Sequence, residues 1–348
     1  MSRTSEHARA PWRSAFVVVV AALALAGCGS VAKVVAPPHL SGTPSISIEV
    51  PLQSVACTTS GACIAAGGDD ANVAPSSTAE VRHVDGTWSA IAVPSTLSQS
   101  ITSSACWSSG CVIGGSEPSG DSLWIYDPAT QSVATSSTPR AGRGVSALSC
   151  YAVASCAVVD TTRITGGSRL SFTSDGGTTW TTPLPLTWTV GDGVTALSCT
   201  DADNCLVAAT NSNHQALLEV THDAGATWSA RTMPTTWTNL SSLTCAKLDC
   251  VALASTTGGS LFERSSTFAR LWRGVKLANS ANALACVRLS RCALVGQTND
   301  QSPWLATLKG RRVTDIALTY VPSALVDVAC GAKTCAAIGV STVLSLQP

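Results

Sequence analysis

The sequence contains little charge and few residues of the helix-forming types Glu, Lys and Gln. Only 12% of its 348 residues are Asp, Glu, Lys or Arg, and 21 basic residues balance 21 acidic ones. A net charge of zero provides no overall attraction to nucleic acid or to an anionic surface, so nucleic acid is not a predicted partner. Ala, Val, Ser, Thr and Gly dominate, in short apolar runs that Gly, Ser, Asp and Pro interrupt. This composition predicts an all-β fold.

The apolar run from Phe16 to Ala26 is too short for a stable membrane span. It follows three arginines and ends in small residues, an order typical of an export signal. Leu25-Ala26-Gly27-Cys28 resembles the lipobox of bacterial lipoproteins, and the resemblance implies cleavage before Cys28 and diacylglyceryl modification of its thiol. An ordinary secretory signal with an unpaired cysteine is the alternative.

These features predict three regions in the chain. Residues 1–27 form a lipoprotein signal peptide, and residues 28–44, with several prolines and no periodicity, form a flexible tether. Residues 45–348 form the folded domain. The predicted location is the extracytoplasmic face of the cell membrane, where the lipid on Cys28 anchors the protein.

The other fourteen cysteines form seven pairs that recur along the chain. Four or five residues separate the members of a pair, and successive pairs begin 41 to 49 residues apart. The pairs are Cys57/Cys63, Cys106/Cys111, Cys150/Cys156, Cys199/Cys205, Cys245/Cys250, Cys286/Cys292 and Cys330/Cys335. This period is typical of propeller blades. The sequence therefore predicts a seven-bladed β-propeller with four antiparallel strands in each blade.

Each cysteine pair is predicted to form a disulfide across the first hairpin of its blade. An exported chain with an even number of cysteines after Cys28 favours disulfides. Zinc is the alternative, but its sites need converging pairs with shorter internal spacing, and five histidines cannot serve seven pairs. We therefore predict no metal site and no cofactor.

The third unit illustrates the expected strands, at residues 145–150, 156–161, 169–174 and 179–184. The seventh unit has three such segments, at 325–330, 335–340 and 342–346, and then the chain stops. Residues 45–51 resemble the fourth strand of other units. We expect them to complete the last blade and close the ring, which would remove an exposed sheet edge.

Two turn segments carry a more specific resemblance. Thr173–Trp180 and Val220–Trp228, with a shorter relative at Val84–Trp88, resemble the Asp-box, or bacterial neuraminidase repeat, of sialidases and related propellers. The Asp can cap a tight turn, the glycines allow positive φ, and the Trp can cover the hairpin. The resemblance implies a structural role, so Asp175 and Asp223 are not predicted to be catalytic. The cysteine-bearing repeat also resembles secreted actinobacterial propellers with one disulfide per blade.

A ligand is expected on the face opposite the cysteine hairpins and Asp-box turns, where the loops vary most. The candidate residues are Trp188, Trp237, Asp192, Asp160 and Arg163. Two neighbouring exposed tryptophans could stack on a sugar or anchor a protein, and the alternative is that each packs between blades. Sialidase chemistry requires a tyrosine nucleophile and three clamping arginines, and only Tyr320 among three tyrosines is plausibly placed. We predict a non-catalytic binding or scaffold propeller for a protein or envelope glycan, with a glycan hydrolase on the same face as the alternative.

Overall fold

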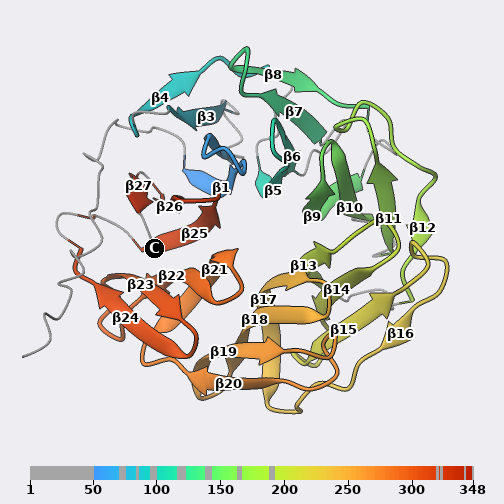
Figure 1. Cartoon of the computed structure of the whole chain (residues 1–348), viewed down its shortest axis with the longest axis vertical. Helices are drawn as coiled ribbons and strands as arrows, with labels where there is room; N and C mark the ends of the chain where they lie inside the picture. Colours follow the sequence, from blue (N-terminus) through green and yellow to red (C-terminus); the bar gives the residue numbers. More distant parts are fainter. Residues whose placement is uncertain are drawn as a thin grey trace, which may run out of the picture. The chain divides into compact units, whose positions relative to one another are not determined.

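A computed structural model of the chain describes residues 51–69, 76–83, 86–94, 100–115, 123–137, 143–162, 167–187, 193–318, 321, 324–340 and 342–346. These residues form 27 β-strands and no helix. The strands assemble into six four-stranded sheets and one three-stranded sheet around a central opening (Figure 1). The prediction of an all-β, seven-bladed propeller is confirmed.

The strands follow the chain order within every blade. The first three blades contain β1 (Leu52–Cys57), β2 (Cys63–Asp69), β3 (Ser76–Arg82), β4 (Trp88–Ile91), β5 (Ile101–Cys106), β6 (Cys111–Gly115), β7 (Leu123–Asp127), β8 (Ser132–Thr135), β9 (Arg143–Ala152), β10 (Ser155–Thr162), β11 (Ser168–Thr173) and β12 (Leu184–Pro185). The fourth and fifth contain β13 (Gly193–Cys199), β14 (Cys205–Thr210), β15 (Ala216–Thr221), β16 (Ser229–Ala230), β17 (Trp237–Ala246), β18 (Asp249–Thr256), β19 (Gly259–Ser265) and β20 (Arg273–Lys276). The last two contain β21 (Ser280–Arg288), β22 (Arg291–Gln297), β23 (Pro303–Lys309), β24 (Arg312–Ile316), β25 (Leu325–Cys330), β26 (Cys335–Gly339) and β27 (Thr342–Leu346).

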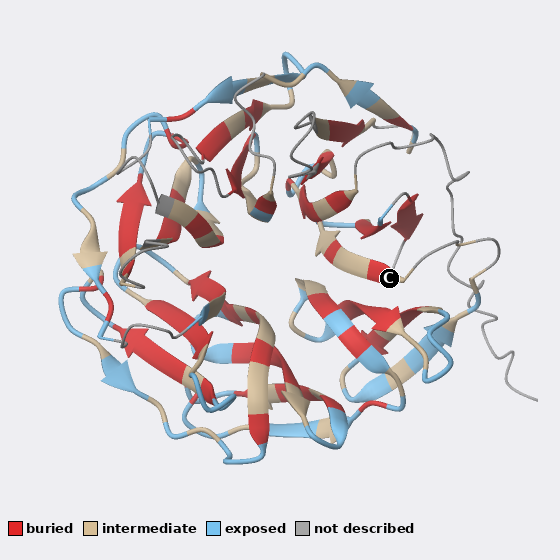
Figure 2. Ribbon diagram, turned by 180° about the vertical axis from the view of Figure 1, so that it is seen from behind, coloured by how far each residue is buried: buried red, intermediate tan, exposed pale blue. Residues whose placement is uncertain are grey.

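The second strand of each blade is deeply buried. β6 and β26 are buried at every position, and β14 and β22 at all but one or two, because neighbouring blades cover both faces of these strands. This explains their continuous runs of Ala, Val, Leu and Ile, without polar alternation. Figure 2 shows buried positions concentrated in the inner strands of the blades and exposed positions in the outermost strands.

The seven predicted disulfides are present. Each joins two cysteines that are direct register partners across the first hairpin of a blade, with Cα atoms 3.9 to 4.1 Å apart. The bridges lie at the ends of the blades and not in the middle of the sheets, because the second cysteine begins or nearly begins the second strand.

The second cysteine of each bridge is also an interior residue, which was not predicted from the sequence. In the Cys150–Cys156 bridge, Cys156 is 0% exposed and packs in the cluster between the second and third blades. In the Cys245–Cys250 bridge, Cys250 is 1% exposed and packs between the fourth and fifth blades. The reason is that each begins the strand that neighbouring blades cover. These sulfurs therefore belong to the core and are not available to a ligand.

One strand was predicted at the wrong residues. The fourth strand of the third blade is β12, at Leu184–Pro185, whereas residues 179–184 were expected. The Asp175 carboxylate accepts hydrogen bonds from Thr179 N (2.9 Å) and Thr179 Oγ1 (2.6 Å), which keep residue 179 in the turn and delay the strand.

The predicted closing strand, residues 45–51, lies outside the described residues apart from Pro51. The described seventh blade contains β25, β26 and β27. Immediately after Pro51, Leu52 N donates a hydrogen bond to Val340 O (3.0 Å), which brings the start of β1 against the end of β26. The first and last blades are therefore joined by hydrogen bonds within the described residues.

Candidate functional site

The propeller has two distinct faces. The cysteine hairpins and the turns between third and fourth strands lie together on one of them, as predicted, because their backbones are hydrogen-bonded. Gly176 N donates to Ala154 O (2.8 Å), and Phe268 N donates to Leu248 O (2.8 Å). We call this the cysteine face. The opposite face, which contains the turns between second and third strands, is called the loop face.

The predicted ligand residues do not form an exposed patch within the described structure. Trp237 is only 3% exposed and packs edge-on against Trp272, with ring centroids 5.8 Å apart, in the core between the fourth and fifth blades. Asp160 is 5% exposed within β10. Both are interior residues, because each belongs to a strand that neighbouring elements cover. Trp188, Asp192 and Arg163 lie outside the described residues.

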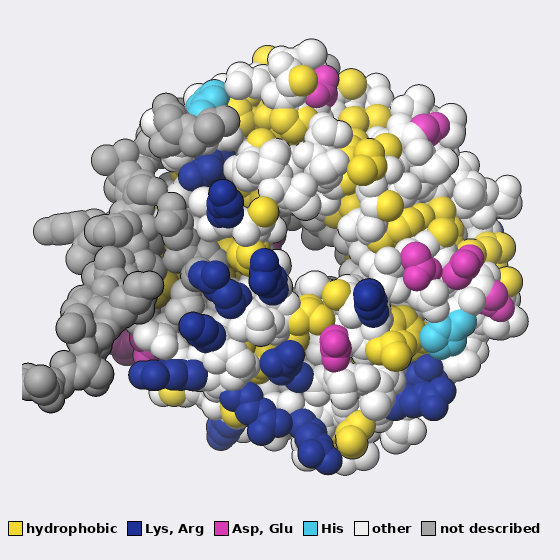
Figure 3. Space-filling model, in the orientation of Figure 1, with side chains coloured by type: hydrophobic (Ala, Val, Ile, Leu, Met, Phe, Trp, Pro, Cys, Tyr) yellow, Lys and Arg dark blue, Asp and Glu magenta, His cyan; other side chains and the backbone are white. Residues whose placement is uncertain are grey.

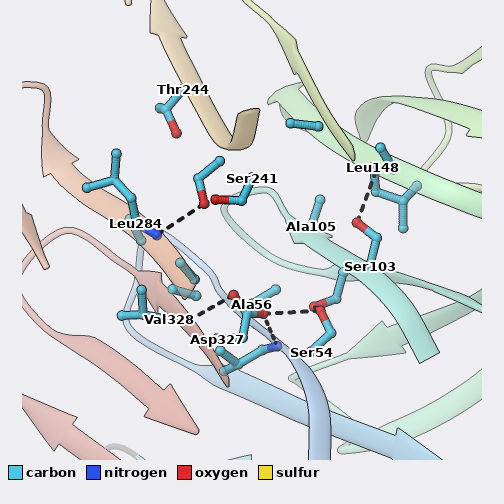
Figure 4. Close-up of a pocket in the computed structure, with 18 of the residues that line it drawn as sticks. Ser54, Ala56, Ser103, Ala105, Leu148, Ser241, Thr244, Leu284, Asp327 and Val328 are labelled. Carbon is cyan, nitrogen blue, oxygen red and sulfur yellow. Dashed lines mark hydrogen bonds between the residues drawn. The ribbon is translucent and has the colours of Figure 1, made fainter. Parts of the chain in front are cut away.

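A central channel of about 460 Å³ runs through the ring. Its walls are the first strands of the blades, and their inward side chains are mostly serine, threonine and alanine (Figure 4). The hydroxyl groups of Thr195 and Ser241 have no hydrogen-bond partner among the described residues. Asp327 on β25 is the one carboxylate in this lining. The channel is therefore polar but nearly uncharged.

Hydrogen bonds between neighbouring blades surround this channel. Ser103 and Ser242 each lie three residues before the first cysteine of their blade. Ser103 Oγ accepts a hydrogen bond from Leu148 N (3.1 Å), and Ser242 Oγ accepts one from Leu284 N (3.1 Å). In both cases a side chain of one blade accepts a hydrogen bond from the backbone of the next. A serine three residues before the first cysteine of a blade thus links that blade to the next one.

Asp327 occupies the same position in the seventh blade and joins it to the first. One of its oxygens accepts hydrogen bonds from Val55 N (2.9 Å) and Ser54 Oγ (3.4 Å), and the other accepts from Val328 N (2.8 Å). Burial raises the pKa of this carboxyl to about 6, and the hydrogen bonds partly oppose that rise. A single half-buried carboxyl held by backbone groups serves the contact between blades more readily than hydrolysis, which needs a second carboxyl.

A second cavity, of about 430 Å³, lies on the cysteine face between the fifth and sixth blades. Arg264, Arg273 and Arg311 line it together with Asp249 and the exposed side chain of Leu271. We call this cavity the arginine pocket. Arg264 and Arg273 are direct cross-strand partners on β19 and β20, so their side chains leave the same side of the sheet. The pocket concentrates positive charge, and guanidinium groups bind carboxylate and phosphate oxygens through paired hydrogen bonds.

The turn beside this pocket differs from its equivalents in the third and fourth blades. In the fourth blade, Thr221 Oγ1 accepts from Gly225 N (2.8 Å), and the Asp223 carboxylate accepts from Thr227 N (2.8 Å). The hydroxyl and the backbone N–H of Thr227 and the hydroxyl of Thr221 donate hydrogen bonds to Asp223 and lower its pKa, and the equivalent contacts of Asp175 lower its pKa to about 2. Both carboxylates are therefore ionised at neutral pH.

In the fifth blade a hydroxyl replaces this carboxylate. Ser265 Oγ accepts from Ala269 N (3.1 Å), and Thr267 Oγ1 accepts from Leu271 N (3.1 Å), which reproduces the turn without an aspartate. Ala269 takes a left-handed φ of 64°, where the fourth blade has a glycine. The substitution removes a negative charge from the edge of the arginine pocket.

Other charges near the pocket are few. Asp249 is the one carboxylate in the lining of the pocket. Burial raises the pKa of Glu263, on the opposite side of β19, and Arg311 opposes that rise. Three guanidinium groups therefore face one exposed carboxylate, Asp249. The described part of the chain contains no cluster of three or more His, Cys, Asp or Glu residues that could hold a metal ion.

Sequence reasoning did not find this site. The three arginines are 9 and 38 residues apart in sequence, and they meet only through the register of β19 with β20 and the packing of two blades. One signal was available: in an alignment of the seven units, the fifth has Ser-Ser-Thr where the fourth has Thr-His-Asp, next to two arginines. That comparison would have shown the loss of the turn aspartate.

Comparisons with known proteins identify the architecture and no family. No family model matches the chain, and no curated protein matches it. Among solved structures, the chain is similar to YCF48 bound to D1 peptide, with a TM-score of 0.62 and 15% identity, covering 89% of this chain and 99% of that one. Virginiamycin B lyase from Staphylococcus aureus has a TM-score of 0.62 and 9% identity, with coverage of 86% and 95%. The RRP9 WD40 repeats have a TM-score of 0.63 and 10% identity, with coverage of 90% and 98%. Identities this low establish a shared propeller fold alone.

Proposed function

We propose that this chain is an exported, lipid-anchored propeller that binds a protein partner without catalysing a reaction. The observation that carries the proposal is the composition of the two described cavities. Each contains a single carboxylate, Asp327 in the central channel and Asp249 in the arginine pocket. Glycosidases typically use two carboxyl groups about 5 to 9.5 Å apart, so neither lining supplies the pair that the hydrolase alternative needs.

The chemistry of the arginine pocket supports recognition. Two β-strands and a turn bring its three arginines to one cavity, where guanidinium groups can pair with carboxylate oxygens of a partner. Propellers of similar structure include both binding proteins and enzymes, since one of them has a bound peptide and another is a lyase. The distinction therefore rests on the residues of this chain and not on its fold.

The anchoring part of the proposal rests on the Leu25-Ala26-Gly27-Cys28 motif. None of the described residues forms a helix that is long and apolar enough to cross a membrane. Acylation would place the propeller at the outer surface of the cell membrane, where its disulfides persist. A glycan of the envelope remains the second ligand class that the proposal includes.

Two experiments test the proposal. In cells that express the full chain, Cys28→Ala is expected to move the protein from the detergent phase to the aqueous phase in a two-phase partition. Ser30→Ala serves as the control and should stay in the detergent phase. Equal partition of the two variants would contradict anchoring through Cys28.

The second experiment addresses catalysis. The purified propeller is incubated with envelope polysaccharide of the source cell, and new reducing ends are measured. We expect no release above that of a heat-denatured sample. Release that Asp327→Ala or Asp249→Ala abolishes would replace the binding proposal with the hydrolase, because one of the two carboxylates would then be catalytic.

A further inference from the structure

The sixth blade presents a row of cations across all four of its strands. Arg288 pairs with Arg291, Arg291 with Lys309, and Lys309 with Arg312 in the register of β21 to β24. All four side chains are exposed at the cysteine face. We call this set the basic row. Like charges directly opposite each other destabilise a sheet, so local folding does not favour this arrangement.

The basic row continues into the arginine pocket. Arg311 lines the pocket and directly precedes Arg312 in the turn between β23 and β24. Adjacent strands are about 4.8 Å apart, so the row spans about 14 Å, the length of about four residues of extended chain. An extended segment of six to eight residues would therefore be long enough to follow the row and reach the pocket.

The charge of the propeller is strongly divided, although the net charge is zero. Residues 237–316, the fifth and sixth blades, contain ten basic and four acidic residues, a difference of +6. Residues 101–230, the second to fourth blades, contain four basic and ten acidic residues, a difference of −6. Figure 3 shows Lys and Arg gathered over one part of the visible face and Asp and Glu over another. The two groups of blades therefore carry opposite charges, although the net charge of the chain is zero.

This division selects among anionic partners. A flat anionic membrane that covered the cysteine face would also meet the exposed carboxylates of Asp175, Asp201, Asp203 and Asp223. Their repulsion opposes that orientation. A partner narrower than the face can contact the fifth and sixth blades alone.

The lining of the arginine pocket narrows the ligand class further. Asp249 would repel a uniformly anionic polymer, but it can accept a hydrogen bond from an amide N–H. Leu271 is 55% exposed at the pocket, and Leu248 is 63% exposed at the tip of the neighbouring cysteine hairpin. A polypeptide offers carboxylates, amide N–H groups and apolar side chains together. We infer that the basic row and the arginine pocket form one surface that binds an acidic polypeptide segment, which deepens and rests on the proposed binding function.

Fluorescence anisotropy with a labelled eight-residue peptide of alternating Glu and Leu tests the inference. The peptide is expected to bind the disulfide-bonded propeller, and a matched, unlabelled Lys/Leu peptide should not displace it. Arg273→Glu in the pocket, and Arg288→Glu with Arg312→Glu in the row, should each weaken binding by about tenfold, and raised salt should weaken it as well. These side chains are exposed, and circular dichroism of each variant confirms that it folds.

Lys276→Glu is the matched control. Lys276 lies at the other end of β20, next to Gly258 on the loop face, so its reversal should change the affinity by less than about twofold. Failure of the acidic peptide to bind, or equal affinity in all variants, overturns the inference. Tighter binding to phosphatidylglycerol vesicles than to the peptide, lost in the same variants, also overturns it, in favour of a membrane surface. Either result would leave the broader binding function standing. That function is tested separately by photo-crosslinking in cells, which detects a protein partner of any chemistry.

Discussion

Replacing Asp327 with Asn is expected to stabilise the propeller at neutral pH. Burial in the channel raises the pKa of this carboxyl from its usual 3.8 to about 6. The folded state therefore holds the proton more tightly than the unfolded chain does. The contribution of this group to stability is complete below about pH 4 and is lost as the pH rises through about 6. Two pKa units correspond to about 3 kcal/mol.

Asparagine keeps a carbonyl oxygen that can accept the hydrogen bond from Val55 N, loses the acceptor of the hydrogen bond from Val328 N, and has no charge to bury. At pH 7.5 the free energy of unfolding of Asp327→Asn should exceed that of the unmodified chain by up to about 3 kcal/mol. The difference should shrink towards zero at pH 4, where both side chains are neutral. Carboxylates such as Asp175 contribute equally to both proteins and cancel in the difference.

Urea unfolding followed by tryptophan fluorescence at pH 4, 5, 6 and 7.5 measures this difference. Ser242→Ala, at the equivalent position of the fifth blade, removes a hydrogen bond without a titrating group, so its effect should not depend on pH. If Asp327→Asn is instead the less stable protein at pH 7.5, an ionised carboxylate stabilises the ring, and the argument from burial is refuted.

Three further changes test other parts of the structure by the same unfolding assay. Replacing Cys286 and Cys292 with Ala opens a six-residue loop and should cost about 2 kcal/mol; an unchanged stability would show that this bridge constrains little. Thr221→Val leaves the buried N–H of Gly225 without its acceptor and should cost about 1 to 3 kcal/mol, and a neutral effect would contradict the turn geometry. Trp237→Ala should cost about 3 to 5 kcal/mol because the indole is buried between blades, whereas a lost ligand affinity at full stability would restore it as a binding residue.

The architecture was predictable because it repeats. Seven cysteine pairs at a steady period define the blades, and each pair marks the hairpin at which two strands must meet. The ends of β25, β26 and β27 lie within one residue of their predicted positions. The fourth strand of the third blade was less predictable, since hydrogen bonds to Asp175 decide where the turn ends. The burial of Cys156 and Cys250 was not predictable either, because it depends on which blade covers the second strand.

The candidate site was not predictable in the same way. It depends on which residues become register partners, as with Arg264 and Arg273, and on how two neighbouring blades pack against each other. Trp237 is a second example. A tryptophan near a loop can be exposed or buried, and its burial here depends on the packing against Trp272, which the sequence does not reveal. Composition indicated zero net charge, whereas function depends on how the charges are distributed.

Site-specific photo-crosslinking in cells tests most directly that this propeller binds a protein through its cysteine face. Benzoylphenylalanine is placed at Leu271, which is exposed beside the arginine pocket, or at Asn213, which is exposed in a turn on the loop face. We predict a discrete crosslinked protein from position 271 that disappears with Arg273→Glu, and none from position 213. Crosslinking from position 213 alone, or a product that Arg273→Glu leaves intact, would contradict the account.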